Sequence, residues 1–225
     1  KFIVSIDQGT TSSRAVLFNL QGKSLFKSQI EIKQYFPKNG WVEQNPSEIW
    51  NKTKKVLLQA IKKSTKLNGE ILSIGITNQR ETTILWDKKT GRSIYNAIVW
   101  QDRRTTDFCK KYSLNKIREK IIRKKTGLII DPYFSATKIK WIIKNVKKAK
   151  ILLKQKRLLF GTIDTFLLWK LSKGKIHATD ATNASRTMLY NINKNKWDTE
   201  ILKSFHIPPN ILPIIKNSSD YYGLT

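Results

Sequence analysis

The sequence predicts an α/β fold in which strands come first and helices dominate the later part. Three observations support this prediction. Alternating apolar patterns begin at once, one strongly marked helix follows them, and further strand patterns give way to helical ones after residue 103. Of the 225 residues, 40% are hydrophobic and 10% aromatic, which is enough to form a core. This composition argues against intrinsic disorder despite the high net charge.

The first segments predict two successive hairpins. Residues 2–7 alternate and are rich in Ile and Val, so we expect a strand. Residues 9–13 form a turn, after which 14–19 read as the returning strand. A second turn at Gln21-Gly22 leads into a strand over 24–32.

A helix start follows at Asn45-Pro46-Ser47-Glu48. Asn45 suits the N-cap, Pro46 suits the first helical position, and Glu48 gives a spacing like that of a capping box. Apolar residues then recur at helical spacing from Ile49 to Ile61, with lysines mostly on the opposite face.

Further strands are expected over 71–77, 82–87 and 98–100, with a turn at 88–91. The nearly continuous apolar character of the first predicts a central position in the sheet. Beyond residue 103 we expect helices over 103–125, 135–149 and 162–172. The lysines of 138–150 are expected to form a solvated face around Ile139, Ile142, Ile143 and Val146.

The charge is strongly positive, with 43 Lys+Arg against 16 Asp+Glu and a net charge of +27. Such a charge suggests nucleic acid as a partner. However, only nine of the basic residues are Arg, and the lysines are spread along the chain. The joint abundance of Lys, Ile and Asn indicates an AT-rich genome. We therefore expect no specific nucleic-acid partner, although the positive field favours an anionic small molecule such as a nucleotide.

Cys109, His177 and His206 are the only cysteine and histidines. Such small numbers exclude a disulfide framework, a cysteine-cluster zinc site and a histidine-rich metal site. We expect Cys109 to be a packed thiol and both histidines to be structural. No apolar run reaches the roughly 18 residues of a membrane helix, and no signal peptide is visible. A soluble cytoplasmic protein without a membrane span is expected.

Residues Asp7–Arg14 form the first candidate site, a hairpin in which four hydroxyl residues follow Gly9. Its N–H groups and hydroxyls can surround a phosphate, whose charge is spread over several oxygens. Asp7 can hold Mg²⁺ directly or through water. The alternative interpretation is a plain hairpin with Ser/Thr turn chemistry.

Residues Thr77–Thr83 form the second candidate, seven polar residues between two apolar runs. The adjacent Arg80 and Glu81 place donors beside an acceptor, which suits a small polyol. The alternative is a polar loop with a local ion pair. Trp100, after a short strand, can line an aliphatic carbon chain or pack in the core, and Tyr133, before a helix, can donate a hydroxyl or simply pack.

Taken together, these motifs resemble the amino-terminal half of the FGGY family of carbohydrate kinases, and within it the members that phosphorylate glycerol. The similarity runs essentially from Lys1 to Thr225, and the Gly-Ile-Thr-Asn-Gln-Arg-Glu-Thr-Thr stretch is far more specific than a lone glycine-rich loop. The matching segments are Asp7–Arg14, Gly40–Glu43, Gly75–Thr83, Asn96–Arg104, Thr126–Phe134, Phe160–Lys170 and Thr179–Leu189.

The resemblance implies a ribonuclease-H-like (actin-type ATPase) fold, a mixed sheet with helices on both faces, with residues 1–225 as one amino-terminal domain. It implies transfer of phosphate from ATP to glycerol with Mg²⁺ as cofactor. The implied contacts are Thr10, Thr11, Ser12 and Arg14 with the nucleotide phosphates, Asp7 with Mg²⁺, Arg80, Glu81 and Tyr133 with the glycerol hydroxyls, and Trp100 with its carbon face.

The resemblance also implies that the catalytic base and the adenosine pocket belong to a carboxy-terminal half that follows these residues. We therefore expect no catalytic residue within this chain, no activity of the 225 residues alone, and a homo-oligomer when the protein is intact. Two alternatives stay open. One is a kinase of the same family for another small polyol or sugar, and the other is a truncated remnant without activity.

Overall fold

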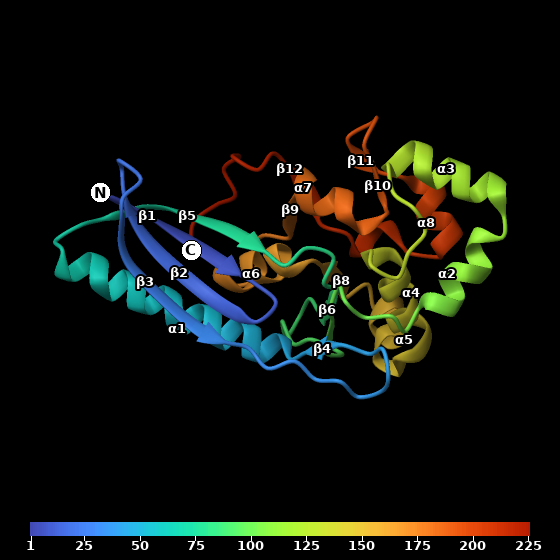
Figure 1. The fold of residues 1–225 in the computed structure, drawn as a ribbon, viewed down its shortest axis with the longest axis horizontal. Coiled ribbons are helices and arrows are strands. Elements are labelled where there is room, and N and C mark those ends of the chain that lie inside the picture. Colours follow the sequence, from blue (N-terminus) through green and yellow to red (C-terminus); the bar gives the residue numbers. More distant parts are fainter. The chain divides into compact units, whose positions relative to one another are not determined.

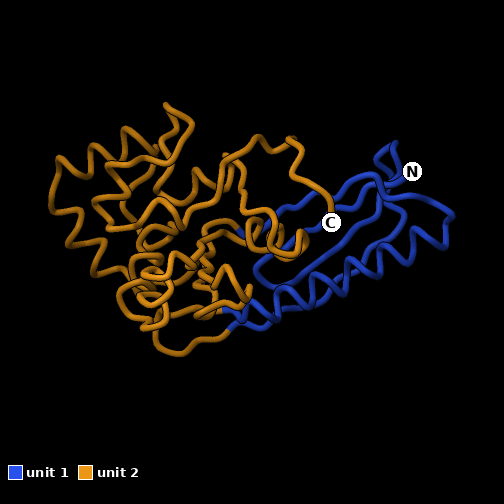
Figure 2. Tube along the Cα trace, turned by 180° about the vertical axis from the view of Figure 1, so that it is seen from behind, with its two compact units in different colours: residues 1–34, 44–79 blue, residues 35–43, 80–225 orange.

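The computed structural model describes residues 1–225, and their contacts divide the chain into two compact units, coloured separately in Figure 2. Unit 1 consists of Lys1–Gln34 and Gln44–Gln79. Unit 2 consists of Tyr35–Glu43 and Arg80–Thr225. Because unit 2 takes a short segment from within the sequence of unit 1, neither unit is one continuous stretch of chain.

Unit 1 contains a four-stranded mixed sheet with the order β3-β2-β1-β5. Strand β1 runs antiparallel to β2 and parallel to β5, and β2 runs antiparallel to β3. This arrangement confirms the two predicted hairpins. The strands are β1 (Phe2–Gln8), β2 (Ser12–Asn19), β3 (Ser24–Glu31) and β5 (Ile71–Asn78).

Helix α1 (Pro46–Lys66) packs along this sheet, as Figure 1 shows. Its start is the predicted one, because the side chain of Asn45 accepts the N–H of Ser47 at 2.9 Å and that of Glu48 at 3.4 Å. The buried face of the helix repeats at helical spacing and consists of Ile49, Thr53, Val56, Leu57, Ala60 and Ser64.

The expected central position of the strand near residue 71 is wrong. Strand β5 stands last in the order of the sheet, and its pattern alternates between half-buried and exposed residues. Leu72 is 49% exposed. An apolar run indicates a strand but does not by itself distinguish the middle of a sheet from its edge.

Two predicted helices of unit 2 are each divided in the structure. The span 103–125 contains α2 (Thr106–Ser113) and α3 (Lys116–Thr126), because Asn115 begins a new helix by accepting the N–H of Arg118 at 2.9 Å. The span 135–149 contains α4 (Ser135–Asn145) and the start of α5 (Lys147–Lys154), with Val146 extended between them. Helix α6 (Ile163–Leu171) confirms the third prediction.

The strands predicted over 82–87 and 98–100 correspond to β6 (Ile84–Asp87) and to β7 (Ala97–Ile98). The sequence patterns missed the other strands of unit 2, because two to four residues are too few to establish a period. Strand β6 pairs antiparallel with β8 (Leu158–Gly161), β9 (Ala178–Asp180) runs parallel to β12 (Ile214–Lys216), and β10 (Tyr190–Asn191) pairs with β11 (Lys196–Trp197). The remaining elements are β4 (Glu43–Gln44), α7 (Ala181–Ala184), α8 (Thr199–Phe205) and two short 3₁₀ turns, Ser185–Thr187 and Pro209–Ile211.

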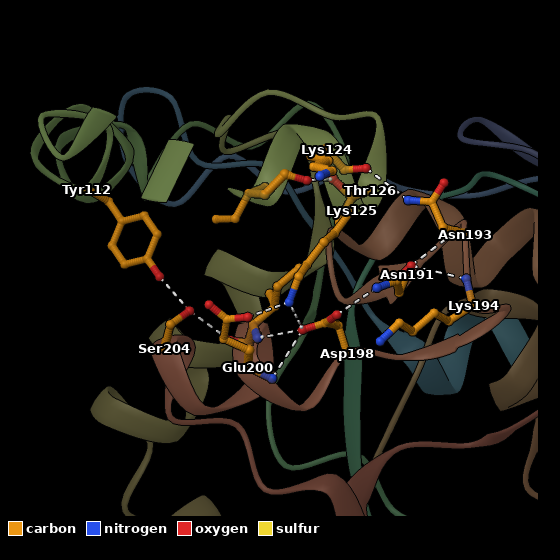
Figure 3. A network of polar contacts seen from close by, with 12 residues as sticks. Tyr112, Lys124, Lys125, Thr126, Asn191, Asn193, Lys194, Asp198, Glu200 and Ser204 are labelled. Atoms are coloured by element: carbon orange, nitrogen blue, oxygen red, sulfur yellow. Dashed lines mark hydrogen bonds and ion pairs between the residues drawn. The ribbon is translucent and has the colours of Figure 1, made fainter. Parts of the chain in front are cut away.

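Polar contacts join α3 to the start of α8 at one edge of unit 2 (Figure 3). Lys125 Nζ lies 3.1 Å from Asp198 Oδ1 and also pairs with Glu200, while Asn191 donates to the other oxygen of Asp198 at 2.8 Å. Burial opposes the charge of Asp198, but these bonds and the N–H of Ile201 hold its pKa below the usual value.

Cys109 lies buried in the apolar core of unit 2, as predicted, and burial raises the pKa of its thiol to about 11. His177 is also mostly buried, and its Nε2 donates to the carbonyl of Phe160 at 2.8 Å. None of the helices combines the length and the apolar character that a transmembrane span requires.

Candidate functional site

The hairpin between β1 and β2 is fixed mainly through its backbone. The N–H of Gly9 donates to the carbonyl of Ser12 at 2.9 Å and closes the turn. The carbonyl of Thr10 accepts from Gln44 Nε2 at 2.5 Å, and that of Thr11 accepts the N–H of Ile32 at 2.8 Å. Thr10 is half-buried and Thr11 exposed. The turn is therefore rigid at the positions where we expect phosphate contacts.

The two serines of the hairpin differ in their roles. Ser13 is fully buried, donates to Gln8 Oε1 at 2.6 Å and lies 3.3 Å from the hydroxyl of Thr53 on α1, so it belongs to the packing of unit 1. Ser12 Oγ accepts from Gln29 Nε2 at 3.1 Å, and Ser12 as a residue is 8% exposed. Because Oγ is the acceptor in this bond, the hydroxyl hydrogen of Ser12 can still be donated.

Asp7 and Arg14 face each other across the hairpin as register partners, with 3.5 Å between Arg14 Nη1 and Asp7 Oδ2. Arg14 also donates from Nε to Gln29 Oε1 at 3.1 Å. Both side chains keep more than a third of their surface exposed. No group of three or more His, Cys, Asp or Glu side chains could hold a metal ion by itself. A single carboxylate fits Mg²⁺ that takes its other ligands from phosphates and water.

Glu81 of unit 2 combines a buried carboxylate with an unusual backbone. Its φ is 62°, in the left-handed region that non-glycine residues rarely occupy. Residues with this conformation are often found at functional sites. Its side chain is 4% exposed and accepts from Arg186 Nε at 2.5 Å. Arg80 is exposed and makes no ion pair with Glu81. The ion pair between Arg80 and Glu81, which the alternative interpretation as a polar loop assumed, therefore does not form.

Trp100 and Tyr133 meet edge to face, with ring centroids 5.5 Å apart. The guanidinium of Arg186 lies 5.6 Å from the ring of Tyr133 and 5.1 Å from that of Phe134. Arg186 thus contacts both Glu81 and Tyr133, and Tyr133 contacts Trp100. We call Glu81, Trp100, Tyr133 and Arg186 the Glu81 cluster. It contains three of the four residues expected to bind a polyol. The fourth, Arg80, is exposed and forms no ion pair with Glu81.

A buried ion-pair network holds the loop that follows Trp100. Arg104, whose side chain is 1% exposed, pairs with Glu43 at 2.7 Å and with Asp102 at 2.8 Å. Its guanidinium lies 3.8 Å from the ring centroid of Trp41. Burial opposes the positive charge, yet the hydrogen bonds that Arg104 donates to Asp102 and Glu43 raise its pKa. This network explains Asp102 and Arg104 as residues that support the loop rather than bind a ligand.

Arg186 was missed by the sequence reasoning. It lies in the Thr179–Leu189 segment, which carried the family resemblance without any assigned role, and it is 105 positions from Glu81. An arginine within a matching motif was the available signal. No local pattern connects positions so far apart.

A model of the FGGY family of carbohydrate kinases, N-terminal domain, matches residues 2–225. The chain belongs to this family. Among curated relatives, it is 54% identical over 223 residues to a glycerol kinase of Malacoplasma penetrans and 53% identical over 225 residues to one of Clostridium beijerinckii. These alignments cover 99% and 100% of the chain but 44% and 45% of the relatives. The chain therefore spans about half the length of the curated relatives it matches.

Solved structures confirm the fold class. The crystal structure of Plasmodium falciparum glycerol kinase with ADP is 38% identical, with a TM-score of 0.93 over 99% of this chain and 44% of that one. A ligand-bound xylulose kinase from Lactobacillus acidophilus, 24% identical, has a TM-score of 0.83 over 96% of this chain and 42% of that one, which shows the shared fold alone. The expected ribonuclease-H-like, actin-type fold is thereby confirmed.

Proposed function

We propose that the protein containing these residues transfers the γ-phosphoryl group of ATP to glycerol, giving ADP and glycerol 3-phosphate, and that residues 1–225 form its amino-terminal domain. The observation that supports glycerol best is the Glu81 cluster, in a chain more than 50% identical to glycerol kinases. A buried carboxylate beside a phenol suits a small molecule with hydroxyls on neighbouring carbons.

In this proposal Arg80, Glu81 and Tyr133 bind the glycerol hydroxyls, and Trp100 lies against the carbon chain. The buried Glu81 carboxylate would disfavour an analogue that lacks a hydroxyl, because part of its hydrogen-bonding capacity would then be left unpaired. Arg186 supports the proposal by holding the Glu81 carboxylate in one orientation. The exposed guanidinium of Arg80 is free to turn toward a bound ligand.

Thr10, Thr11, Ser12 and Arg14 are proposed to contact the nucleotide phosphates. The rigid turn and the half-exposed Arg14 support this role, since phosphoryl transfer depends on alignment and on neutralising charge. Asp7 would hold Mg²⁺, which when bound offsets the charge of the phosphates. The oxygen of one glycerol hydroxyl attacks the γ-phosphorus, the bond to the ADP oxygen breaks, and a base takes the hydroxyl proton.

We assign that base to residues beyond Thr225, because the relatives are about twice as long and no carboxylate of the Glu81 cluster is free. Cytoplasmic location and homo-oligomerisation of the intact protein belong to the same proposal. Sedimentation of the intact protein tests its oligomeric state.

The decisive assay offers ATP and Mg²⁺ with glycerol, propane-1,2-diol, erythritol, xylulose and gluconate to the full-length protein. We expect glycerol to be preferred strongly over the others, and the 225-residue chain alone to be inactive. Preference for another polyol or sugar would support a sister specificity, and no turnover by the full-length protein would support a remnant. Robust turnover by the 225 residues alone would place the base within them.

Replacing Arg80 in the full-length protein tests its assignment. Arg80→Ala should raise the KM for glycerol at least tenfold, because a charged donor to the hydroxyls is lost, and should leave the KM for ATP nearly unchanged. Arg92→Ala, at another exposed arginine of unit 2, serves as the control. Unchanged glycerol kinetics in Arg80→Ala would remove Arg80 from the site.

A further inference from the structure

Lys138 is the one lysine of this lysine-rich chain that is fully buried. It lies in the first turn and a half of α4, and its exposed fraction is 0%. The sequence pattern placed it on a solvated face with the lysines that follow, and that expectation is wrong for this residue. A lysine is almost never fully buried without a specific reason, because the ammonium loses its water.

The ammonium is satisfied by backbone carbonyls rather than by a carboxylate. Lys138 Nζ donates to the carbonyl of Tyr133 at 2.7 Å and to that of Glu81 at 3.4 Å. The hydroxyl of Ser135, one turn earlier, donates to the same Glu81 carbonyl at 3.0 Å. Burial lowers the pKa of Lys138 to about 7, although Asp102, Glu81 and Asp131 oppose this change. The protein therefore keeps this side chain buried at a cost in free energy.

The two carbonyls belong to two residues of the Glu81 cluster that are far apart in sequence. Glu81 also has the left-handed backbone, so its peptide group needs support to keep that conformation. Lys138 and Ser135 donate to its backbone carbonyl, and Arg186 donates to its carboxylate at 2.5 Å. A single ammonium thus links the backbone of Glu81 to that of Tyr133.

We propose that Lys138 is a positioning residue that sets the spacing between Glu81 and Tyr133, so that their side chains match neighbouring hydroxyls of the polyol. This inference rests on the proposed function and deepens it. Lys138 touches no reacting atom and acts only through the two residues it joins. The spacing that it sets determines which polyols are bound and aligned well. A misplacement of a positioning side chain by about 1 Å is enough to cost on the order of a hundredfold in rate.

The test uses the full-length protein with Lys138→Met, which keeps the length and removes the donors. We expect the KM for glycerol to rise at least tenfold, the KM for ATP to stay within about twofold, and the preference for glycerol over propane-1,2-diol to narrow. A purely structural role would instead lower the amount of folded protein and kcat while leaving the KM for glycerol unchanged.

Lys140→Met is the matched control, because Lys140 lies on the same helix and also donates to a backbone carbonyl, that of Phe205 at 3.1 Å. It should leave both KM values unchanged. Ser135→Ala removes one bond to the Glu81 carbonyl and should raise the glycerol KM in the same direction by a smaller factor, so it decides the question if Lys138→Met does not fold.

If folded Lys138→Met has the same KM for glycerol as the wild type, this inference is overturned and the proposed function stays intact. If Lys138→Met does not fold, an unchanged KM for glycerol in Ser135→Ala has the same meaning. Absence of glycerol phosphorylation by the full-length wild-type protein overturns both.

Discussion

Arg186 holds the Glu81 carboxylate in one orientation by a contact that local sequence patterns do not reveal. It is 32% exposed, so one side of its guanidinium meets solvent while Nε meets the carboxylate. The bond from Nε holds the Glu81 carboxylate in one place within the Glu81 cluster.

Arg186→Gln should raise the KM for glycerol at least tenfold in the full-length protein, and Arg186→Lys should give an intermediate value because it keeps the charge but not the planar donor geometry. Arg157→Gln is a close control, since Arg157 pairs with Asp87 in the same unit and the two side chains are also 32% and 4% exposed. If the Arg157 and Arg186 variants change glycerol kinetics equally, Arg186 has no specific role in the site.

The left-handed backbone of Glu81 predicts a measurable difference between two substitutions. Glu81→Ala and Glu81→Gly both remove the carboxylate, but only glycine adopts a φ of 62° without steric cost. The glycine variant should be more stable than the alanine variant by about 1 kcal/mol in urea unfolding. Both should lose glycerol phosphorylation. Equal stabilities would mean that the backbone relaxes when the carboxylate is gone.

At the scale of elements, one capping residue predicted a helix start correctly and another was overlooked. Asn45 predicted the start of α1 because a cap is a local interaction of neighbouring residues. Asn115 also caps a helix, but the residues on both sides of it follow a helical pattern, so the sequence predicted one helix where the structure has two. The interior position of Lys138 was beyond local prediction, since one of its two carbonyl partners, that of Glu81, is 57 positions away.

The cap of α1 can be tested directly. Asn45→Ala should lower the free energy of unfolding by about 1 kcal/mol, because two N–H groups of the first turn lose their acceptor. Asn45→Asp keeps an acceptor and adds a favourable charge at the helix start, so it should be neutral or stabilising. Urea denaturation followed by circular dichroism measures both. A loss of the same size in the aspartate variant would argue against capping as the cause.

At the scale of the whole molecule, two mostly buried groups of unit 2 respond to pH in opposite ways. Burial lowers the pKa of His177 to about 4, although its bond to the Phe160 carbonyl opposes the change. Burial raises the pKa of Asp164 to about 6 against the hydrogen bonds from Thr162 and Thr179. Between pH 6.5 and 4 the unfolded chain binds a proton at His177, whereas below pH 6 the folded chain binds one at Asp164.

Stability should therefore change little between pH 6.5 and 4.5 in the wild type as far as this pair is concerned. In Asp164→Asn the His177 effect stands alone, and stability should fall on acidification by about 1 kcal/mol per pH unit. In His177→Gln it should rise on acidification as Asp164 takes up its proton. Chemical denaturation at several pH values measures these slopes. Parallel slopes in all three proteins would exclude both assignments.

The alternation of the chain between the two units constrains how genes of this family can recombine. Tyr35–Glu43 belongs to unit 2 but is encoded between the two parts of unit 1, and Glu43 pairs with Arg104 and accepts from Tyr95 at 2.7 Å. Consider a single crossover between the genes of two diverged relatives, placed after the codon for Glu43. The product takes Glu43 from one parent and its partner Arg104 from the other. Exchanging unit 2 as a whole takes more than one crossover. Inheritance should therefore keep the Trp41–Glu43 segment and the Arg104 loop together as a matched set.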